Sequence, residues 1–241
     1  MEAIVLAGGL GTRISSRLGD CPKAMAPVGG RPFLEFLLDR LIDSGCQRVL
    51  LSVGHLRHVI EQTFGGVYRG IALQYVIEES PLGTGGAIKR ALEYAHDAAV
   101  LVANGDTYAD GDVTALFDAH CAGKRPLTMA ITHVEDMGRY GGVVVEDGAV
   151  TGFIEKGRKG PGWINAGTYV FDREFPWPLD LPPRFSFETD LLTPHIAGLR
   201  PRAFSFSGYF LDIGVPEDLD RAQIELPKSS ARPSSQTAKQ G

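Results

Sequence analysis

The sequence predicts an α/β fold, a doubly wound mixed sheet that is mainly parallel and carries a small β-rich lobe. Two observations predict it. Apolar runs typical of buried strands alternate with amphipathic helical patterns through the first half of the 241 residues. Shorter strand-like runs separated by turn signals then crowd residues 127–172. We therefore expect one Rossmann-like domain over residues 1–226, with the lobe at 127–172 inside it.

The elements of the first half follow from hydrophobic periodicity. The expected strands are residues 3–7, 48–53, 72–77 and 99–103, each a short apolar run. The expected helices are residues 32–44, 58–64, 86–95 and 112–120, each with apolar positions three or four apart. Strands joined by helices pair in parallel, which predicts helices on the faces of the sheet.

The second half contains more strands. Asp147-Gly148 is a strong hairpin signal between the strands expected at 142–145 and 150–154. The other expected strands are 127–134, 163–171, 203–206 and 209–213, and the expected helices are 189–196 and 216–224. From Pro227 the composition changes to Lys, Ser, Ala, Pro, Gln and Gly, so we expect residues 227–241 to form a disordered tail.

Composition excludes several classes of protein. A formal net charge of -5 argues against a nucleic-acid-binding surface, which needs a basic face. No apolar run approaches 18 residues, so we expect no membrane span. The three cysteines fit neither a disulfide framework nor a zinc pattern, and the N-terminus lacks a signal-peptide pattern. A cytoplasmic protein is expected.

A glycine loop directly after the first strand is the strongest functional signal. Its glycines expose backbone N–H groups in a tight turn without Cβ atoms, which suits a polyphosphate. Arg13 and Lys23 supply countercharge. The loop therefore predicts a nucleoside triphosphate site formed by Leu6, Ala7, Gly8, Gly9, Gly11, Thr12, Arg13 and Lys23.

This loop matches neither of the two commonest glycine motifs. A Walker A loop needs a glycine before a lysine, and a dinucleotide fingerprint read from Gly9 needs a glycine at Ile14. The alternative is a strand-to-helix turn that merely requires glycine.

A second glycine loop, residues 81–87, lies between a strand and a helix. Gly83 and Thr84 would let a flat base lie against the backbone. The preceding Glu78 and Glu79 are carboxylates, and a carboxylate accepts two donors side by side, as guanine N1–H and N2–H₂ provide. We assign Glu79 to the nucleotide, although a solvated pair of acids at a strand end is the open alternative.

Two further aspartates end strands. Asn104 and Asp106 follow the 99–103 strand, and Asp212 lies in the 209–213 strand. The carboxyl ends of strands form the crevice where open α/β sheets bind ligands. Two carboxylates converging on phosphates suit Mg²⁺. Each aspartate alone is more typical of a helix cap or turn, so the metal site rests on their joint placement.

Three groups suit a second, anionic and hydroxyl-rich substrate: Glu155-Lys156, Asn165 and Glu188. Ser186 favours a helix cap. His55 and His58 are more typical of a surface helix than of a metal site. Trp163 and Trp177 are more typical of packing than of base stacking.

Together, residues 6–13, Lys23, residues 81–87, Asp106, Glu155-Lys156, Asn165-Ala-Gly167 and Asp212 resemble the sugar-1-phosphate nucleotidyltransferases, in order and spacing, over about residues 2–225. Within that superfamily the run 78–87 most resembles D-glycero-D-manno-heptose 1-phosphate and mannose 1-phosphate guanylyltransferases.

The resemblance implies roles for these residues. Arg13, Lys23 and Asp106 are expected to be catalytic, and Mg²⁺ is expected on Asp106 and Asp212. Lys156 would bind the sugar phosphate, joined by Gly141, Glu155, Asn165 and Glu188. The implied reaction transfers GMP from GTP to a sugar 1-phosphate for surface polysaccharide synthesis, and the implied assembly is a homodimer. Alternatives are mannose or glucose 1-phosphate with another nucleotide, or a nucleotide-sensing regulatory subunit that has lost turnover.

Overall fold

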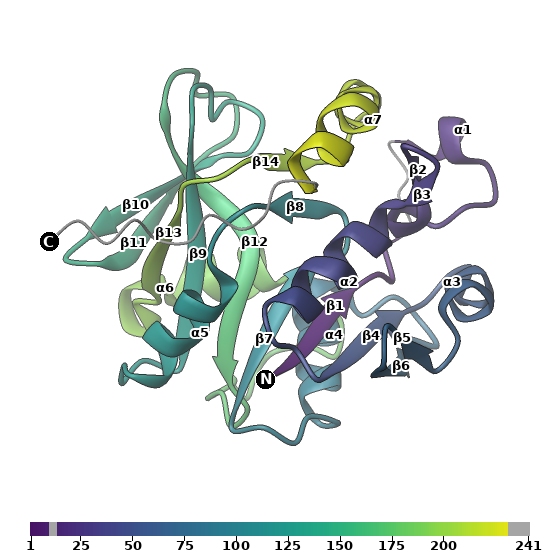
Figure 1. The fold of residues 1–241 in the computed structure, drawn as a ribbon. Coiled ribbons are helices and arrows are strands. Elements are labelled where there is room, and N and C mark those ends of the chain that lie inside the picture. Colours follow the sequence, from purple (N-terminus) through teal and green to yellow (C-terminus); the bar gives the residue numbers. More distant parts are fainter. Residues whose placement is uncertain (10–13, 231–241) are drawn as a thin grey trace, which may run out of the picture.

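A computed structural model of the chain describes residues 1–9 and 14–230. A ten-stranded mixed sheet with the order β10-β11-β13-β9-β12-β7-β1-β4-β6-β5 forms its centre (Figure 1). The predicted α/β class with a doubly wound mixed sheet is confirmed. Among the described residues, no helix is long and apolar enough to cross a membrane.

The first half builds the parallel part of the sheet. Its strands are β1 (Glu2–Leu6), β4 (Arg48–Val53), β6 (Ile71–Ile77) and β7 (Ala99–Asn104), with β5 (Val67–Tyr68) antiparallel at the edge. In register, Leu6 pairs with Ser52 of β4 and with Asn104 of β7. The carboxyl ends of three strands therefore lie level, and each predicted nucleotide residue either ends a strand, as Leu6 and Asn104 do, or follows one in sequence.

Helices cover both faces because each strand is apolar on both sides. Ala3 and Val5 of β1 are buried with residues of α2 (Phe33–Asp43), α3 (Arg57–Phe64) and α5 (Val113–Cys121). Ile4, between them, is buried with residues of α4 (Gly83–Leu92) and of the π-helical turn η2 (Phe187–Leu192). This alternation follows from the two-residue period of a strand. α6 (Thr193–Leu199) continues η2.

The strands of the predicted lobe extend the same sheet. They are β9 (Leu127–Val134), β10 (Gly142–Glu146), β11 (Ala149–Ile154) and β12 (Gly162–Asp172), joined by β13 (Arg202–Phe206). β12 pairs antiparallel with β7 on one side and with β9 on the other. The expectation of a lobe beside the sheet is therefore corrected. The edge of β7 needed a partner, and β12 supplies it.

Several short elements had no sequence signal. They are α1 (Ser15–Leu18), η1 (Lys23–Met25), the β2 (Pro27–Val28)–β3 (Arg31–Pro32) hairpin, and β8 (Thr107–Ala109), which pairs with β14 (Phe210–Asp212). Two to four residues are too few to show a period. α4 also begins three residues before its predicted start, at Gly83.

α7 (Pro216–Ser230) runs past Pro227, where the tail was expected to begin. Pro227 itself packs against the β2–β3 turn, since a Cβ on Gly29 would lie 2.8 Å from Pro227 Cγ. Gln223 accepts a hydrogen bond from Gly29 N at 3.0 Å and also donates to Pro27 O, which holds the helix against the β2–β3 hairpin. The disordered state of the tail beyond Ser230 stays a prediction, because residues 231–241 lie outside the described part of the chain.

Candidate active site

The first glycine loop leaves the sheet between two other segments. Ala7 N donates to Ser52 O at 2.8 Å, which extends the β1–β4 ladder by one bond. A Cβ on Gly8 would overlap the Glu78 carboxylate and lie 3.4 Å from Gly54 N. A side chain at Gly8 would therefore displace the Glu78 carboxylate from its place beside the loop. The predicted residues Gly11, Thr12 and Arg13 lie outside the described residues.

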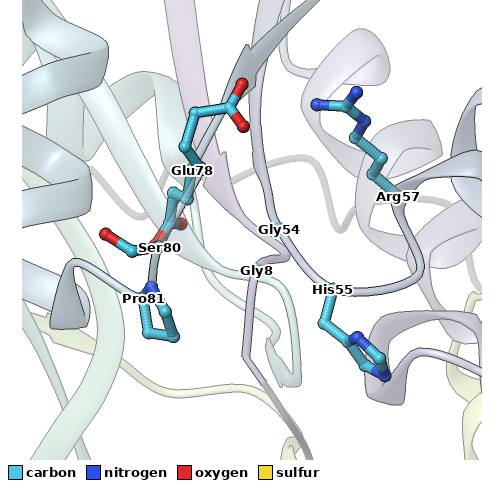
Figure 2. A pocket seen from close by; sticks show the side chains of 8 residues that line it. Gly8, Gly54, His55, Arg57, Glu78, Ser80 and Pro81 are labelled. Atoms are coloured by element: carbon cyan, nitrogen blue, oxygen red, sulfur yellow. The ribbon is translucent and has the colours of Figure 1, made fainter.

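A pocket of about 380 Å³ opens beside Gly8 (Figure 2). Its lining residues are Gly8, Gly54, His55, Arg57, Glu78, Glu79, Ser80 and Pro81. They come from the ends of β1, β4 and β6, so the pocket lies at the carboxyl edge of the sheet. This is where open α/β sheets bind their ligands.

The two glutamates of this pocket differ. Glu78 accepts a hydrogen bond on each of its oxygens, from Ser52 Oγ at 2.9 Å and from Leu82 N at 3.0 Å, so the protein holds this carboxylate in place. Glu79 is exposed, and its side chain has no hydrogen-bond partner among the residues described. Of the two, Glu79, the predicted nucleotide residue, is the one whose whole carboxylate is available to a base.

The second glycine loop packs against residues 183–187. A Cβ on Gly83, which has φ +70°, would overlap the Phe185 carbonyl, and a Cβ on Gly85 would overlap the Phe185 ring. Gly85 N donates to Phe185 O at 3.0 Å, and Thr84 Oγ1 accepts from Phe187 N at 3.0 Å. These glycines therefore allow a close approach of the segment that leads into η2.

Lys23 joins the two aspartates that were predicted to bind metal. Its Nζ donates to Asp106 Oδ2 at 2.6 Å and lies 3.6 Å from Asp212 Oδ1. η1 places Lys23, β14 places Asp212, and Asp106 lies between β7 and β8. The β8–β14 pairing aligns Asp212 with Thr107, beside Asp106. Residues 23, 106 and 212 thus meet at one point.

Gly105 is necessary for this convergence. Its N–H donates to Leu6 O at 2.9 Å. A Cβ at this position would lie 2.6 Å from the same oxygen and 3.3 Å from Ala7 Cα. A side chain would therefore push the Asn104–Asp106 turn away from the start of the glycine loop.

The aspartates fit a divalent cation. Asp212 Oδ1 is buried and has no hydrogen-bond partner among the described residues. Burial and the nearby Asp106 raise the pKa of Asp212, although Lys23 opposes this. Within the described residues no group of three or more His, Cys, Asp or Glu side chains gathers. A two-carboxylate site suits Mg²⁺, which takes its remaining ligands from water and substrate phosphates.

Three of the predicted sugar-phosphate residues, Gly141, Glu155 and Lys156, lie at the end of β11. Gly141 has φ +77°, and a Cβ there would lie 2.9 Å from Ile154 O and 3.4 Å from Lys156 Cγ. Glu155 and Lys156 are both exposed. Their side chains therefore stand free at the end of β11, where an anionic substrate can reach Lys156.

Glu188 and Asn165 are the remaining predicted sugar contacts. Burial raises the pKa of Glu188, and the charge of Lys156 lowers it in part. Asn165 Nδ2 donates to Tyr169 Oη at 2.6 Å, and Gly167 N donates to Asn165 Oδ1 at 3.0 Å. Burial is also the main cause of the raised pKa of Tyr169, and the charges of Glu188 and Asp106 contribute. Lys156 therefore lies within electrostatic reach of Glu188, and Tyr169, which Asn165 contacts, lies within reach of Glu188 and Asp106.

Other outcomes concern residues assigned to packing or surfaces. Ser186 caps η2 by accepting from Thr189 N at 3.2 Å, as predicted. His55 and His58 are both exposed, as expected; His58 lies on α3, whereas His55 lies in the turn before it and lines the pocket. Arg57 also lines the pocket and had no motif to mark it. Both residues lie within four positions of the end of β4, so a polar side chain shortly after a strand was the available signal.

A doubly wound sheet whose carboxyl edge gathers a base-sized pocket, two aspartates and a lysine is the arrangement of an α/β enzyme that acts on a nucleotide. Comparison with known proteins agrees. The chain belongs to the nucleotidyl transferase family, whose model matches residues 2–229.

Relatives match nearly the whole chain. The D-glycero-alpha-D-manno-heptose 1-phosphate guanylyltransferase of Aneurinibacillus thermoaerophilus is 40% identical, covering 94% of this chain and 98% of that protein. The enzyme of the same name from Campylobacter jejuni is 42% identical, covering 90% and 96%. The crystal structure of HddC from Yersinia pseudotuberculosis has a TM-score of 0.81 at 37% identity, covering 93% of this chain and 99% of that one. The same protein has also been solved with GMP-PN.

Proposed function

We propose that this protein is a D-glycero-α-D-manno-heptose 1-phosphate guanylyltransferase, which transfers GMP from GTP to the sugar 1-phosphate and releases pyrophosphate. The observation that carries the proposal is the 40% identity to the A. thermoaerophilus enzyme over 98% of its length. The meeting of Lys23 with Asp106 and Asp212 supports it, because phosphoryl chemistry needs cations and metal-binding carboxylates together.

In the proposed reaction a phosphate oxygen of the sugar 1-phosphate attacks the α-phosphorus of GTP in line. The new P–O bond forms as the bond from the α-phosphorus to the bridging oxygen breaks, and pyrophosphate leaves with that electron pair. A phosphomonoester has a second pKa of about 6, so the nucleophile is already largely anionic at pH 7. The protein must therefore supply positioning and charge stabilisation rather than a general base.

The residues divide this work. Gly8, Gly9 and the neighbouring loop backbone would hold the triphosphate, with Lys23 and Arg13 neutralising it. Glu79 would accept guanine N1–H and N2–H₂. Lys156 would bind the sugar phosphate, and Asn165 and Glu188 would bind sugar hydroxyls.

Asp106 and Asp212 would hold Mg²⁺, which when bound stabilises negative charge on the phosphate oxygens. We place the reaction in the cytoplasm and its product in surface polysaccharide synthesis.

Substrate specificity is tested by pyrophosphate release. GTP, UTP, dTTP and CTP are each paired with heptose, mannose and glucose 1-phosphates, with and without Mg²⁺. We expect the highest kcat/KM for GTP with the heptose 1-phosphate, by at least about tenfold, because a lost polar contact of this kind costs about 1.4 kcal/mol or more. A preference for mannose 1-phosphate would replace the proposed sugar, and no turnover with any pair would favour the regulatory alternative.

Asp106→Asn is the matched catalytic variant. It keeps the shape of the side chain and removes the charge that faces Lys23. We expect turnover to fall by at least about 100-fold while the urea midpoint changes little. Near-normal turnover would remove Asp106 from the proposed metal site.

A further inference from the structure

Asp218 is a buried carboxylate that the proposed reaction does not use. It lies in the first turn of α7, and its side chain is 2% exposed. Arg221 Nη1 donates to its Oδ1 at 3.1 Å, and Arg139 Nη2 donates to its Oδ2. Because a buried charge is stable only when it is paired and hydrogen-bonded, Asp218 depends on these two arginines.

The two arginines come from different parts of the fold. Arg221 lies one turn along α7 from Asp218, so that ion pair is local to the helix. Arg139 lies in the loop between β9 and β10, 79 residues away in sequence. The next residue of that loop, Tyr140, packs edge-on against Phe210 of β14, with ring centroids 5.4 Å apart. The loop therefore docks on both α7 and β14.

The same loop is fastened to the proposed sugar-phosphate residues. Tyr140 N and Gly141 N both donate to Met137 O at 3.0 Å, and Gly157 N donates to Gly138 O at 2.7 Å. The Gly141 backbone lies against Ile154 and Lys156. Residues 136–141 and Lys156 therefore form one unit, which we term the sugar-phosphate loop.

The elements against which this loop packs, β14 and α7, adjoin Asp212 of the proposed metal site. β14 ends at Asp212, and α7 begins four residues later, at Pro216. Figure 1 shows β14 and α7 on the side of the molecule where the loops of the β9–β12 region project. The hydrogen bond to Asp218 is the main cause of the raised pKa of Arg139, and the charge of Asp212 contributes. Arg139 therefore lies within electrostatic reach of the proposed metal site.

We propose that the Arg139–Asp218 ion pair fixes the distance between the sugar-phosphate loop and Asp212, which makes Asp218 a positioning residue for the sugar 1-phosphate. The inference rests on the proposed function, since it needs Gly141 and Lys156 to bind that substrate. Asp218 acts mainly on the acceptor substrate, because Arg139 belongs to the loop that contacts Lys156, whereas the base pocket lies at the ends of β1, β4 and β6.

Three variants test the inference by comparing the change in the KM for heptose 1-phosphate with the change in the KM for GTP. Arg139→Met removes the loop's half of the ion pair at a side chain that is 46% exposed, and Asp218→Asn removes the other half. Arg221→Met is the matched control, since it removes the other arginine from the same carboxylate within α7. We expect the first two variants to raise the KM for heptose 1-phosphate by about tenfold and to change the KM for GTP less than twofold.

The control should change neither KM, and Arg139→Lys should restore part of the loss. An unchanged sugar KM in Arg139→Met, or an equal rise in Arg221→Met, would overturn the inference. Titration of heptose 1-phosphate into protein saturated with a non-hydrolysable GTP analogue gives the same comparison without turnover. If the wild-type protein binds the sugar 1-phosphate but does not turn over, the proposed function is refuted, and the Kd of Arg139→Met for the sugar 1-phosphate still decides the inference. If the wild-type protein does not bind the sugar 1-phosphate, both the proposed function and the inference are overturned.

Discussion

Gly105 offers a quantitative test of how the strand ends create the site. In Gly105→Ala the new Cβ would lie 2.6 Å from Leu6 O, about 0.4 Å inside the 3.0 Å limit that real Cβ contacts respect. Neither partner can rotate away, because both belong to backbone at the end of paired strands. The Asn104–Asp106 turn must therefore move outward from β1 by several tenths of an ångström.

The expected cost follows from this displacement. Overpacking of a well-packed site costs about 1–3 kcal/mol. Replacing glycine by alanine where the backbone permits it gains about 0.4–1 kcal/mol by restricting the unfolded chain. Gly66→Ala is the matched control, because a Cβ there meets no atom within 4 Å and its φ lies outside the left-handed region. The gain from restricting the unfolded chain is common to both variants, so we expect them to differ in unfolding free energy by the overpacking cost, about 1–3 kcal/mol.

Urea denaturation measures this difference, and pyrophosphate release measures its functional consequence. Because Asp106 follows Gly105 directly, the shift should lower kcat by about 100-fold in Gly105→Ala. Gly66→Ala should keep the wild-type rate. A Gly105→Ala protein as stable as Gly66→Ala, with kcat within threefold of the wild type, would refute the reasoning.

Three further predictions concern charged and titratable groups. Glu2 is buried; burial alone would raise its pKa, but hydrogen bonds from Asp97 N, His96 N and Arg48 lower it overall. Glu2→Gln should therefore cost about 1.5–3 kcal/mol in urea denaturation at pH 7, and the difference from wild type should shrink as the pH falls below 4.5. Burial lowers the pKa of His120, although Asp172 opposes this, so the folded protein should lose stability as the pH falls below about 6.5. In melting curves from pH 7.5 to 5.5, the melting temperature of His120→Gln should therefore fall less steeply with pH than that of the wild type. Lys23→Met should lower kcat/KM for GTP by at least about 100-fold in the pyrophosphate assay, whereas Lys89→Met on the exposed face of α4 should leave it unchanged; equal effects would show that only net charge matters.

Sequence periodicity was sufficient for the long elements but not for their lateral order. The run that became β12 was recognisable as a strand, yet nothing local shows that it pairs with β7 rather than standing apart. Pairing between distant strands depends on edges left open elsewhere, which a window of residues cannot contain. The two- and three-residue strands β2, β3 and β8 were missed for the simpler reason that they show no period.

The site was predicted best where a motif marks a strand end. Asp106, Asp212 and Lys23 were recognised, and the structure brings them together. The roles of these residues, and those of Glu79, Lys156, Asn165 and Glu188, stay predictions, as does the homodimer. Arg139 and Asp218 were missed because their significance lies in a contact across 79 residues. In the sequence, an aspartate one turn before an arginine indicates only an ion pair within one helix.

The pairing of β12 with both β7 and β9 has a mechanical consequence. Backbone hydrogen bonds join β7 to β12 and β12 to β9, with a shift of register in the β12–β9 pairing between Asn165 and Tyr169, so a rotation of one half of the sheet against the other would have to break these bonds. The segments at the carboxyl edge must therefore move when two substrates bind and two products leave, while the sheet stays fixed. Rate-limiting steps of this protein should then respond to substitutions in those segments, and hardly at all to changes that stiffen the sheet.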